Sequence, residues 1–271
     1  MASIADHGPA AAPERLGGTA GEIWRDVARG LLAGVLTGLL VGGVGGRLLM
    51  RLAALLVPDA IGLSTRNGAE IGAITLDGTV EVMFYGGLFG GFIAGLVWVA
   101  VSTWIPGHGI RRVLLTMPVA VGLSGFFLIE GDNPDFVVLR HDGLVVASYL
   151  GLASLFGFAI AWLDDVLERR LPYLDGRPGV QIGYAVLIAI GLLLFLPYVV
   201  VAYFRSPTTV PVGLALLVTA LATVVWWGMR AGGQRSPPRN LLIVARAGLL
   251  TAVVVGIVAL VPEVVEALGS G

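Results

Sequence analysis

Seven long apolar stretches constrain this chain more than any other feature of its sequence. Each comes close to the roughly 20 apolar residues that a helix needs to cross a bilayer. Backbone polar groups in lipid must be satisfied within the protein, so such stretches cross it as helices. They cover residues 30–50, 83–104, 112–129, 143–163, 181–203, 209–228 and 241–261. Together with 56% hydrophobic and only 13% charged residues, they predict an all-α polytopic membrane helix bundle with seven transmembrane spans.

Three parts of the chain differ in composition. Residues 1–26 are polar and rich in Ala, Gly and Pro, and predict a flexible cytoplasmic tail. Residues 27–163 predict a glycine-rich four-helix unit with a long external loop at 58–82. Residues 164–271 are mostly Leu, Val and Ala within their spans, and predict a looser three-helix unit that faces the lipid.

Glycines recur at four-residue spacing in the first two spans. The first row is Gly30, Gly34, Gly38, Gly42 and Gly46, and the second is Gly87, Gly91 and Gly95. On a helix of 3.6 residues per turn such a row drifts by about 40° per step, so a partner helix must cross it at an angle. Close backbone contact drives association in lipid, where hydrophobic drive is small. We therefore expect these faces to pack within the chain, against a second copy or against another membrane protein.

Arginine placement predicts the orientation, because basic residues are enriched in cytoplasmic segments. With the N-terminus inside, eleven arginines fall on the inner side: Arg15, Arg25, Arg29, Arg111, Arg112, Arg169, Arg170, Arg177, Arg230, Arg235 and Arg239. Five fall outside: Arg47, Arg51, Arg66, Arg140 and Arg205. We therefore expect a bacterial plasma-membrane protein with a cytoplasmic N-terminus and an external C-terminus.

Arg47 and Arg51 are the most informative polar positions. They lie one helical turn apart near the expected outer boundary of the first span. An arginine at such a depth reaches to the interface or pairs with an acid. The expected partners are Glu70, Asp77 and Glu81 in the following loop. Such a contact would be either a structural clamp or a site for an anion or lipid headgroup, since two guanidinium groups can bind a phosphate or carboxylate.

The loop itself contains a hairpin pattern. Asp77-Gly78 is flanked by Ile74-Thr75-Leu76 and Thr79-Val80, and Asp-Gly between such residues favours a two-residue β-turn. We therefore expect a small external hairpin that caps the bundle.

Two further acidic clusters lie near the ends of spans. Glu130, Asp132 and Asp135, with Asn133, lie within six residues of one external loop and are weak candidates for a hard cation, because the spacing does not fit a calcium loop. A solvated acidic turn is the simpler interpretation. Asp164, Asp165 and Glu168 end the fourth span, where we expect an interfacial charge cluster with Arg246 as partner.

Composition excludes several classes of chemistry. The chain has no cysteine, which excludes disulfides and thiol catalysis. Its basic residues are all arginine, which excludes lysine-dependent phosphate loops and Schiff bases. His7, His108 and His141 are predicted in the tail and on opposite sides, so no paired haem ligands are expected. The net charge of −1 gives no nucleic-acid footprint. We expect no cofactor.

The stretch from Gly42 to Leu52, with the later Gly68-Ala69-Glu70-Ile71-Gly72 and Thr75-Leu76-Asp77-Gly78-Thr79, resembles an uncharacterised group of glycine-rich multi-pass membrane proteins of high-GC bacteria. The resemblance covers about the first 110 residues. It adds emphasis to Arg47, Arg51, Thr75, Asp77 and Thr79, and implies no activity.

Three functions remain open from sequence alone. The first is an accessory or scaffolding subunit without its own chemistry, whose glycine faces bind a membrane partner. The second is a small-solute or ion permeation or transport protein with an outer Arg47 and Arg51 site. The third is an enzyme that acts on a lipid headgroup.

Overall fold

The structure is a computed structural model that describes residues 15–63, 70–73, 75–130, 139, 143–174 and 177–269. These residues form helices and loops without any strand, and seven of the helical rods are long and apolar enough to cross a membrane. The seven-span, all-α prediction is therefore confirmed. The rods are Thr19–Leu56, Leu76–Trp104, Ile110–Leu128, Gly143–Arg170, Pro178–Phe204, Val210–Ala231 and Arg239–Ala267.

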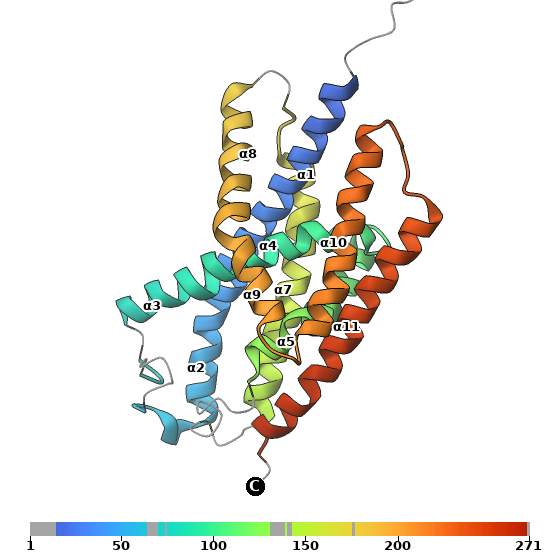
Figure 1. The fold of residues 1–271 in the computed structure, drawn as a ribbon. Helices are drawn as coiled ribbons and strands as arrows, with labels where there is room; N and C mark the ends of the chain where they lie inside the picture. Colours follow the sequence, from blue (N-terminus) through green and yellow to red (C-terminus); the bar gives the residue numbers. More distant parts are fainter. Residues whose placement is uncertain are drawn as a thin grey trace, which may run out of the picture.

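The first rod consists of α1 (Arg15–Thr37), a π-helical segment η1 (Gly38–Gly45) and α2 (Gly46–Leu56). A short helical turn η2 (Pro58–Ala60) follows. The second rod is built in the same way from α3 (Leu76–Val82), a π-helical segment η3 (Met83–Phe89) and α4 (Gly90–Val101), and ends in the turn η4 (Ser102–Trp104). In Figure 1, α2 and α3 diverge from each other at one end of the bundle.

The remaining rods are α5 (Ile110–Leu128), α7 (Gly143–Arg170), the broken rod α8 (Pro178–Ile190), η5 (Gly191–Phe195) and α9 (Leu196–Phe204), then α10 (Val210–Ala231) and α11 (Arg239–Ala267). The π-helical turn η5 directly precedes Pro197, whose ring and missing N–H interrupt the helical ladder. Helix α5 packs against α7 and α11, and α1 packs against α4. Helix α10 packs against α11, as the right side of Figure 1 shows.

Glycines bring the first two rods into direct backbone contact. A Cβ at Gly34 would collide with the backbone of Gly95, and one at Gly42 would collide with the carbonyl of Gly86. A Cβ at Gly91 would lie 2.8 Å from the carbonyl oxygen of Gly34. The two π-helical segments lie against each other at this contact. Glycine has weak α-helical propensity, and both π-helical segments contain more than one glycine.

Two sequence predictions about local structure are wrong. The hairpin expected at 74–80 is helical from Leu76 onward. The side-chain oxygen of Thr75 accepts a hydrogen bond from the Gly78 N–H at 3.2 Å and so caps α3, with Asp77 in its first turn. A carboxylate there favours a helix N-terminus. Thr-Leu-Asp-Gly fits a helix start as well as a turn, and the helix forms.

The flexible tail expected at 1–26 is also wrong over residues 15–26, which are helical because α1 begins at Arg15. Residues Arg25 and Asp26 are held by neighbouring helices. Arg25 donates to the carbonyl oxygens of Glu168 and Leu171, and Asp26 accepts from Arg230 at 2.8 Å. These contacts extend the helix beyond its apolar part. Residues 1–14 lie outside the described part of the chain.

The boundary expected between residues 163 and 164 falls inside α7, which continues unbroken to Arg170. Helices from both sides of that boundary pack on each other, because α11 contacts α5 and α10 contacts α4. The larger of two clusters of buried residues, which includes Trp98, Trp104 and Trp226, connects the two parts.

Candidate functional site

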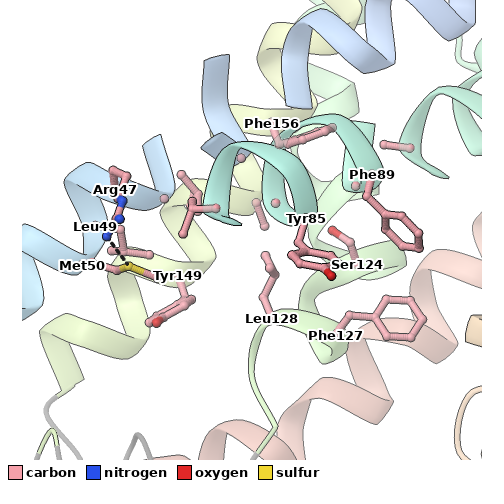
Figure 2. Close-up of a pocket in the computed structure, with 18 of the residues that line it drawn as sticks. Arg47, Leu49, Met50, Tyr85, Phe89, Ser124, Phe127, Leu128, Tyr149 and Phe156 are labelled. Carbon is pink, nitrogen blue, oxygen red and sulfur yellow. Dashed lines mark hydrogen bonds between the residues drawn. The ribbon is translucent and has the colours of Figure 1, made fainter. Parts of the chain in front are cut away.

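A cavity of about 960 Å³ lies between the first two rods on one side and α5 and α7 on the other. Its volume is at the upper end of the range of small-molecule sites. Figure 2 shows its walls, with Tyr85 and Phe89 from η3 facing Ser124, Phe127 and Leu128 from α5. The cavity is a product of helix spacing, because η3 is drawn toward η1 by glycines while α5 is held by α7 and α11.

The cavity is long. On the second rod its lining runs from Gly78 to Val101, which corresponds to about 35 Å of helix. That length is comparable to the hydrocarbon thickness of a bilayer. We call the two ends of the bundle the Arg51 end, where α2 and α3 meet the connecting loop, and the Asp164 end, where α7 finishes.

The Arg51 end of the cavity is polar and charged. Arg47, Arg51, Glu70 and Glu81 line it, together with Gly72 from the connecting loop. Gly72 has a φ of +85°, a left-handed conformation that glycine adopts without strain. Its carbonyl oxygen can therefore point at Arg51.

The two arginines hold backbone and hydroxyl oxygens. Arg47 Nη2 donates to the Thr75 carbonyl at 3.3 Å and to Thr79 Oγ1 at 3.1 Å. Thr79 in turn donates to the Thr75 carbonyl at 2.7 Å. These bonds attach the start of α3 to α2.

Arg51 makes fewer contacts. Its Nη1 donates to the Gly72 carbonyl at 3.2 Å, and its side chain is exposed. The Nε of Arg47 is buried and has no hydrogen-bond partner in the described residues. A guanidinium has five N–H donors, so both arginines keep donors that the described chain does not use.

The expected ion pairs of these arginines with Glu70, Asp77 and Glu81 do not form among the described residues, where the two side chains hydrogen-bond to oxygens of Gly72, Thr75 and Thr79 instead. Glu70 and Glu81 nevertheless line the same cavity. Asp77 is exposed in the first turn of α3 and does not line it. Because α3 is a helix, Asp77 points away from the side that faces Arg47.

The middle of the cavity contains hydroxyl groups that are already satisfied. Thr116 Oγ1 donates to the Arg112 carbonyl at 2.8 Å, Ser124 Oγ to the Ala120 carbonyl at 2.7 Å, and Tyr203 OH to the Leu123 carbonyl at 2.8 Å. With their protons used in this way, these side chains offer the cavity acceptor lone pairs but no free donor. The neighbouring lining is apolar, and includes Leu123, Phe156 and Ile160.

An ion-pair cluster lies beyond the Asp164 end of the cavity. Asp164 is 1% exposed and receives Arg29 Nε at 2.9 Å and Arg112 Nη2 at 3.0 Å. Arg112 also binds Asp165 at 2.7 Å. The cluster therefore joins α1, α5 and α7 at one point.

The cluster is connected to the cavity through one aromatic ring. The guanidinium carbon of Arg112 lies 5.0 Å from the centre of the Trp98 ring, a cation–π distance. Trp98 lines the cavity. The charged cluster thus lies directly behind the cavity at its Asp164 end.

Sequence reasoning missed Arg29 and Arg112 as partners of Asp164, and its choice of Arg246 is wrong. The Nε of Arg246 donates to the Trp104 carbonyl at 3.2 Å. The sequence does place Arg29, Arg112 and Asp164 at span ends on the same expected side of the membrane, which is the one indication that they could meet. Which spans are neighbours could not be read from the chain.

The weak metal candidates are only partly described. Asp132 and Asp135 lie outside the described residues, and Glu130 is an exposed residue just after α5. Within the described ranges no group of three or more His, Asp or Glu side chains is placed to hold a metal ion.

No family model, curated protein or solved structure matches this chain. The function must therefore be argued from the cavity and its surroundings.

Proposed function

We propose that this protein binds an amphipathic molecule with an anionic head group in the intramembrane cavity. The head group binds at Arg47 and Arg51, and the apolar tail lies along the cavity toward Trp98. The main support for this proposal is the cavity of about 960 Å³. Two arginines line one end of it, and the rest of its lining is mostly apolar over a length close to the thickness of a bilayer. A lipid or a lipid-like carrier molecule has this distribution of charge and apolar surface.

The apolar length favours an amphiphile over an ion or a small polar solute. A permeation path needs polar groups that replace water around the solute. The hydroxyls of Thr116, Ser124 and Tyr203 already donate to backbone carbonyls, and the side chains beside them in the lining are apolar. An acyl chain needs no such groups.

The structure supports a scaffolding role less well than the binding of an amphiphile. That role requires free glycine faces, but Gly34, Gly38 and Gly42 lie against the backbone of the second rod. Little of this glycine surface is left for another chain. An enzyme that acts on the head group would use Glu70 or Glu81 as its acid or base, since both line the cavity. No contact of these two carboxylates in the described residues favours an enzyme over a binding protein.

We place the protein in the bacterial plasma membrane, with Arg47 and Arg51 toward the outer leaflet. The arginine distribution supports this orientation. Membership of the glycine-rich group that the chain resembles remains part of the same proposal.

Lipid retention by purified protein tests the function. The delipidated protein is incubated with a phosphoglycerol lipid or with the phosphocholine lipid that has the same chains, and bound lipid is counted by native mass spectrometry. We expect one phosphoglycerol lipid to remain bound. Charge-assisted hydrogen bonds contribute roughly 1.5–3 kcal/mol each, so R51Q lowers affinity for that lipid by about tenfold or more.

Two further variants make the result specific. R205Q changes an exposed arginine that does not line the cavity and leaves retention unchanged. R47K keeps a charge but loses the forked geometry, and weakens retention less than R47Q does. Equal retention of both lipids, or an equal loss in R205Q and R51Q, would show that the arginines do not form the head-group site.

A further inference from the structure

The two walls of the cavity are not closed against each other along one side. Segment η3 packs against η1, α3 and α4, while α5 packs against α7 and α11. Close packing between η3 and α5 does not occur in the described chain. In Figure 2 the side chains of Tyr85 and Leu128 face each other across this interval.

The residues at this side opening are aromatic and exposed. Tyr85 is 61% exposed and Phe127 is 38% exposed, although both line the cavity. A side chain that borders a cavity and is also exposed marks a place where the cavity reaches the outside. The opening therefore has one aromatic side chain on each wall.

This opening faces the bilayer, because both walls belong to membrane-spanning rods. Tyr85 belongs to the rod Leu76–Trp104 and Phe127 to the rod Ile110–Leu128. Tyr85 lies nine residues beyond Leu76, or about 13 Å along the helix. A molecule that crosses the opening passes directly between the cavity and lipid.

Helix α9 borders the same opening through aromatic contacts. Tyr198 lies 4.9 Å from Phe89 of η3, and Tyr203 lies 5.3 Å from Phe127 of α5, measured between ring centres. Its rod is the least buried of the seven. The side opening thus has an apolar and aromatic border, which an acyl chain can cross without desolvating a charge.

We propose that the occupant is a lipid of the surrounding bilayer and that it enters sideways between η3 and α5. Its acyl chain passes between Tyr85 and Phe127, while its anionic head group moves to Arg47 and Arg51. Arg47 lies close to this route, since it binds Thr79, which precedes Tyr85 by about 1.7 helical turns on the same rod. This inference rests on the proposed function and adds the source of the ligand and its route.

A cross-link across the opening tests the route, and the absence of native cysteine makes the chemistry clean. Y85C and F127C are combined, and a bifunctional maleimide bridges them either before or after the protein meets vesicles of phosphocholine lipid that contain a fluorescent phosphoglycerol lipid. The control combines F84C and L114C, which change exposed residues of the same rods that do not line the cavity. A monofunctional maleimide on Y85C/F127C controls for modification alone.

We expect cross-linking before exposure to slow loading at least tenfold, and cross-linking after loading to slow release to the same extent. The F84C/L114C control loads at the rate of the parent protein. The bridged Y85C/F127C protein loads at least tenfold more slowly than the same variant carrying the monofunctional maleimide. If the bridged protein loads as fast as the unbridged protein, sideways passage is wrong, although binding in the cavity stands. If the unbridged protein takes up no phosphoglycerol lipid, the proposed function fails together with the route.

Discussion

At the scale of single residues, the arginines are of two kinds, which differ in whether they form ion pairs with a buried carboxylate. Arg29 and Arg112 are committed to the buried carboxylate of Asp164, whereas Arg51 uses one of its donors on a backbone carbonyl and remains exposed. The first arrangement holds helices together. The second leaves donors for a ligand. Both kinds were visible in the sequence as arginines near span ends, but only the neighbours of each side chain distinguish them.

Removal of the Asp164 carboxylate is expected to destabilise the protein strongly. D164A leaves Arg29 and Arg112 without their shared buried partner, and breaking such a pair costs about 3–5 kcal/mol. E168A is the matched control on the next turn of α7, where the side chain is 59% exposed and lies 3.6 Å from Arg29; such pairs contribute below about 1 kcal/mol. Unfolding in detergent, followed by circular dichroism, measures both. Equal stability of D164A and E168A would contradict the structural role of the cluster.

At the scale of helices, the spans were predictable and the connections between them were not. Hydropathy is a local property, and lipid requires a helix wherever about 20 apolar residues occur. The start of α3 depends instead on whether Thr75 caps a helix or precedes a turn, and the same four residues allow both. The partners of Arg47 follow from that choice, because the helix turns Thr79 toward α2 and Asp77 away from it.

The contact between the first two rods gives a sharp prediction at this scale. G34A places a Cβ against the backbone of Gly95, and overpacking of this kind costs about 1–3 kcal/mol. G183A is the control, since a Cβ at this exposed position in α8 meets nothing within 4 Å and alanine favours a helix by up to about 1 kcal/mol. We expect G34A to unfold at lower denaturant than the parent protein and G183A to unfold at the same concentration or higher. The reverse order would mean that the rods do not touch at Gly34.

At the scale of the whole molecule, the cavity is the feature that sequence could least reveal. It arises because glycines draw η3 onto η1 while α5 is held elsewhere, so it depends on the spacing of helices that are distant in the chain. The sequence selected Arg47, Arg51, Glu70 and Glu81 as a group that forms ion pairs; these four residues line one end of the cavity, but the ion pairs do not form among the described residues. The cavity's apolar length and the ion-pair cluster of Arg29, Arg112 and Asp164 behind Trp98 can be recognised only in the assembled bundle.

The orientation of the whole bundle can be measured with single cysteines in this cysteine-free chain. T208C lies in the α9–α10 connection and Q234C in the α10–α11 connection, and both positions are exposed. With the N-terminus inside, an impermeant maleimide added to intact cells labels T208C and spares Q234C, and both react after permeabilisation. The opposite pattern would invert the protein and place Arg47 and Arg51 toward the cytoplasm.

The most direct test of the central claim is the position of the lipid tail in the bound state. A phosphoglycerol lipid with a photoreactive group at the end of its acyl chain is bound to the purified protein in nanodiscs and irradiated, and labelled residues are identified by peptide mass spectrometry. We predict labels at cavity residues near the Asp164 end, such as Val101, Thr116 and Ile160, and their loss in R51Q. Labels confined to the exposed surface of α8 and η5, such as Val186 and Leu193, and unchanged in R51Q, would contradict a lipid in the cavity.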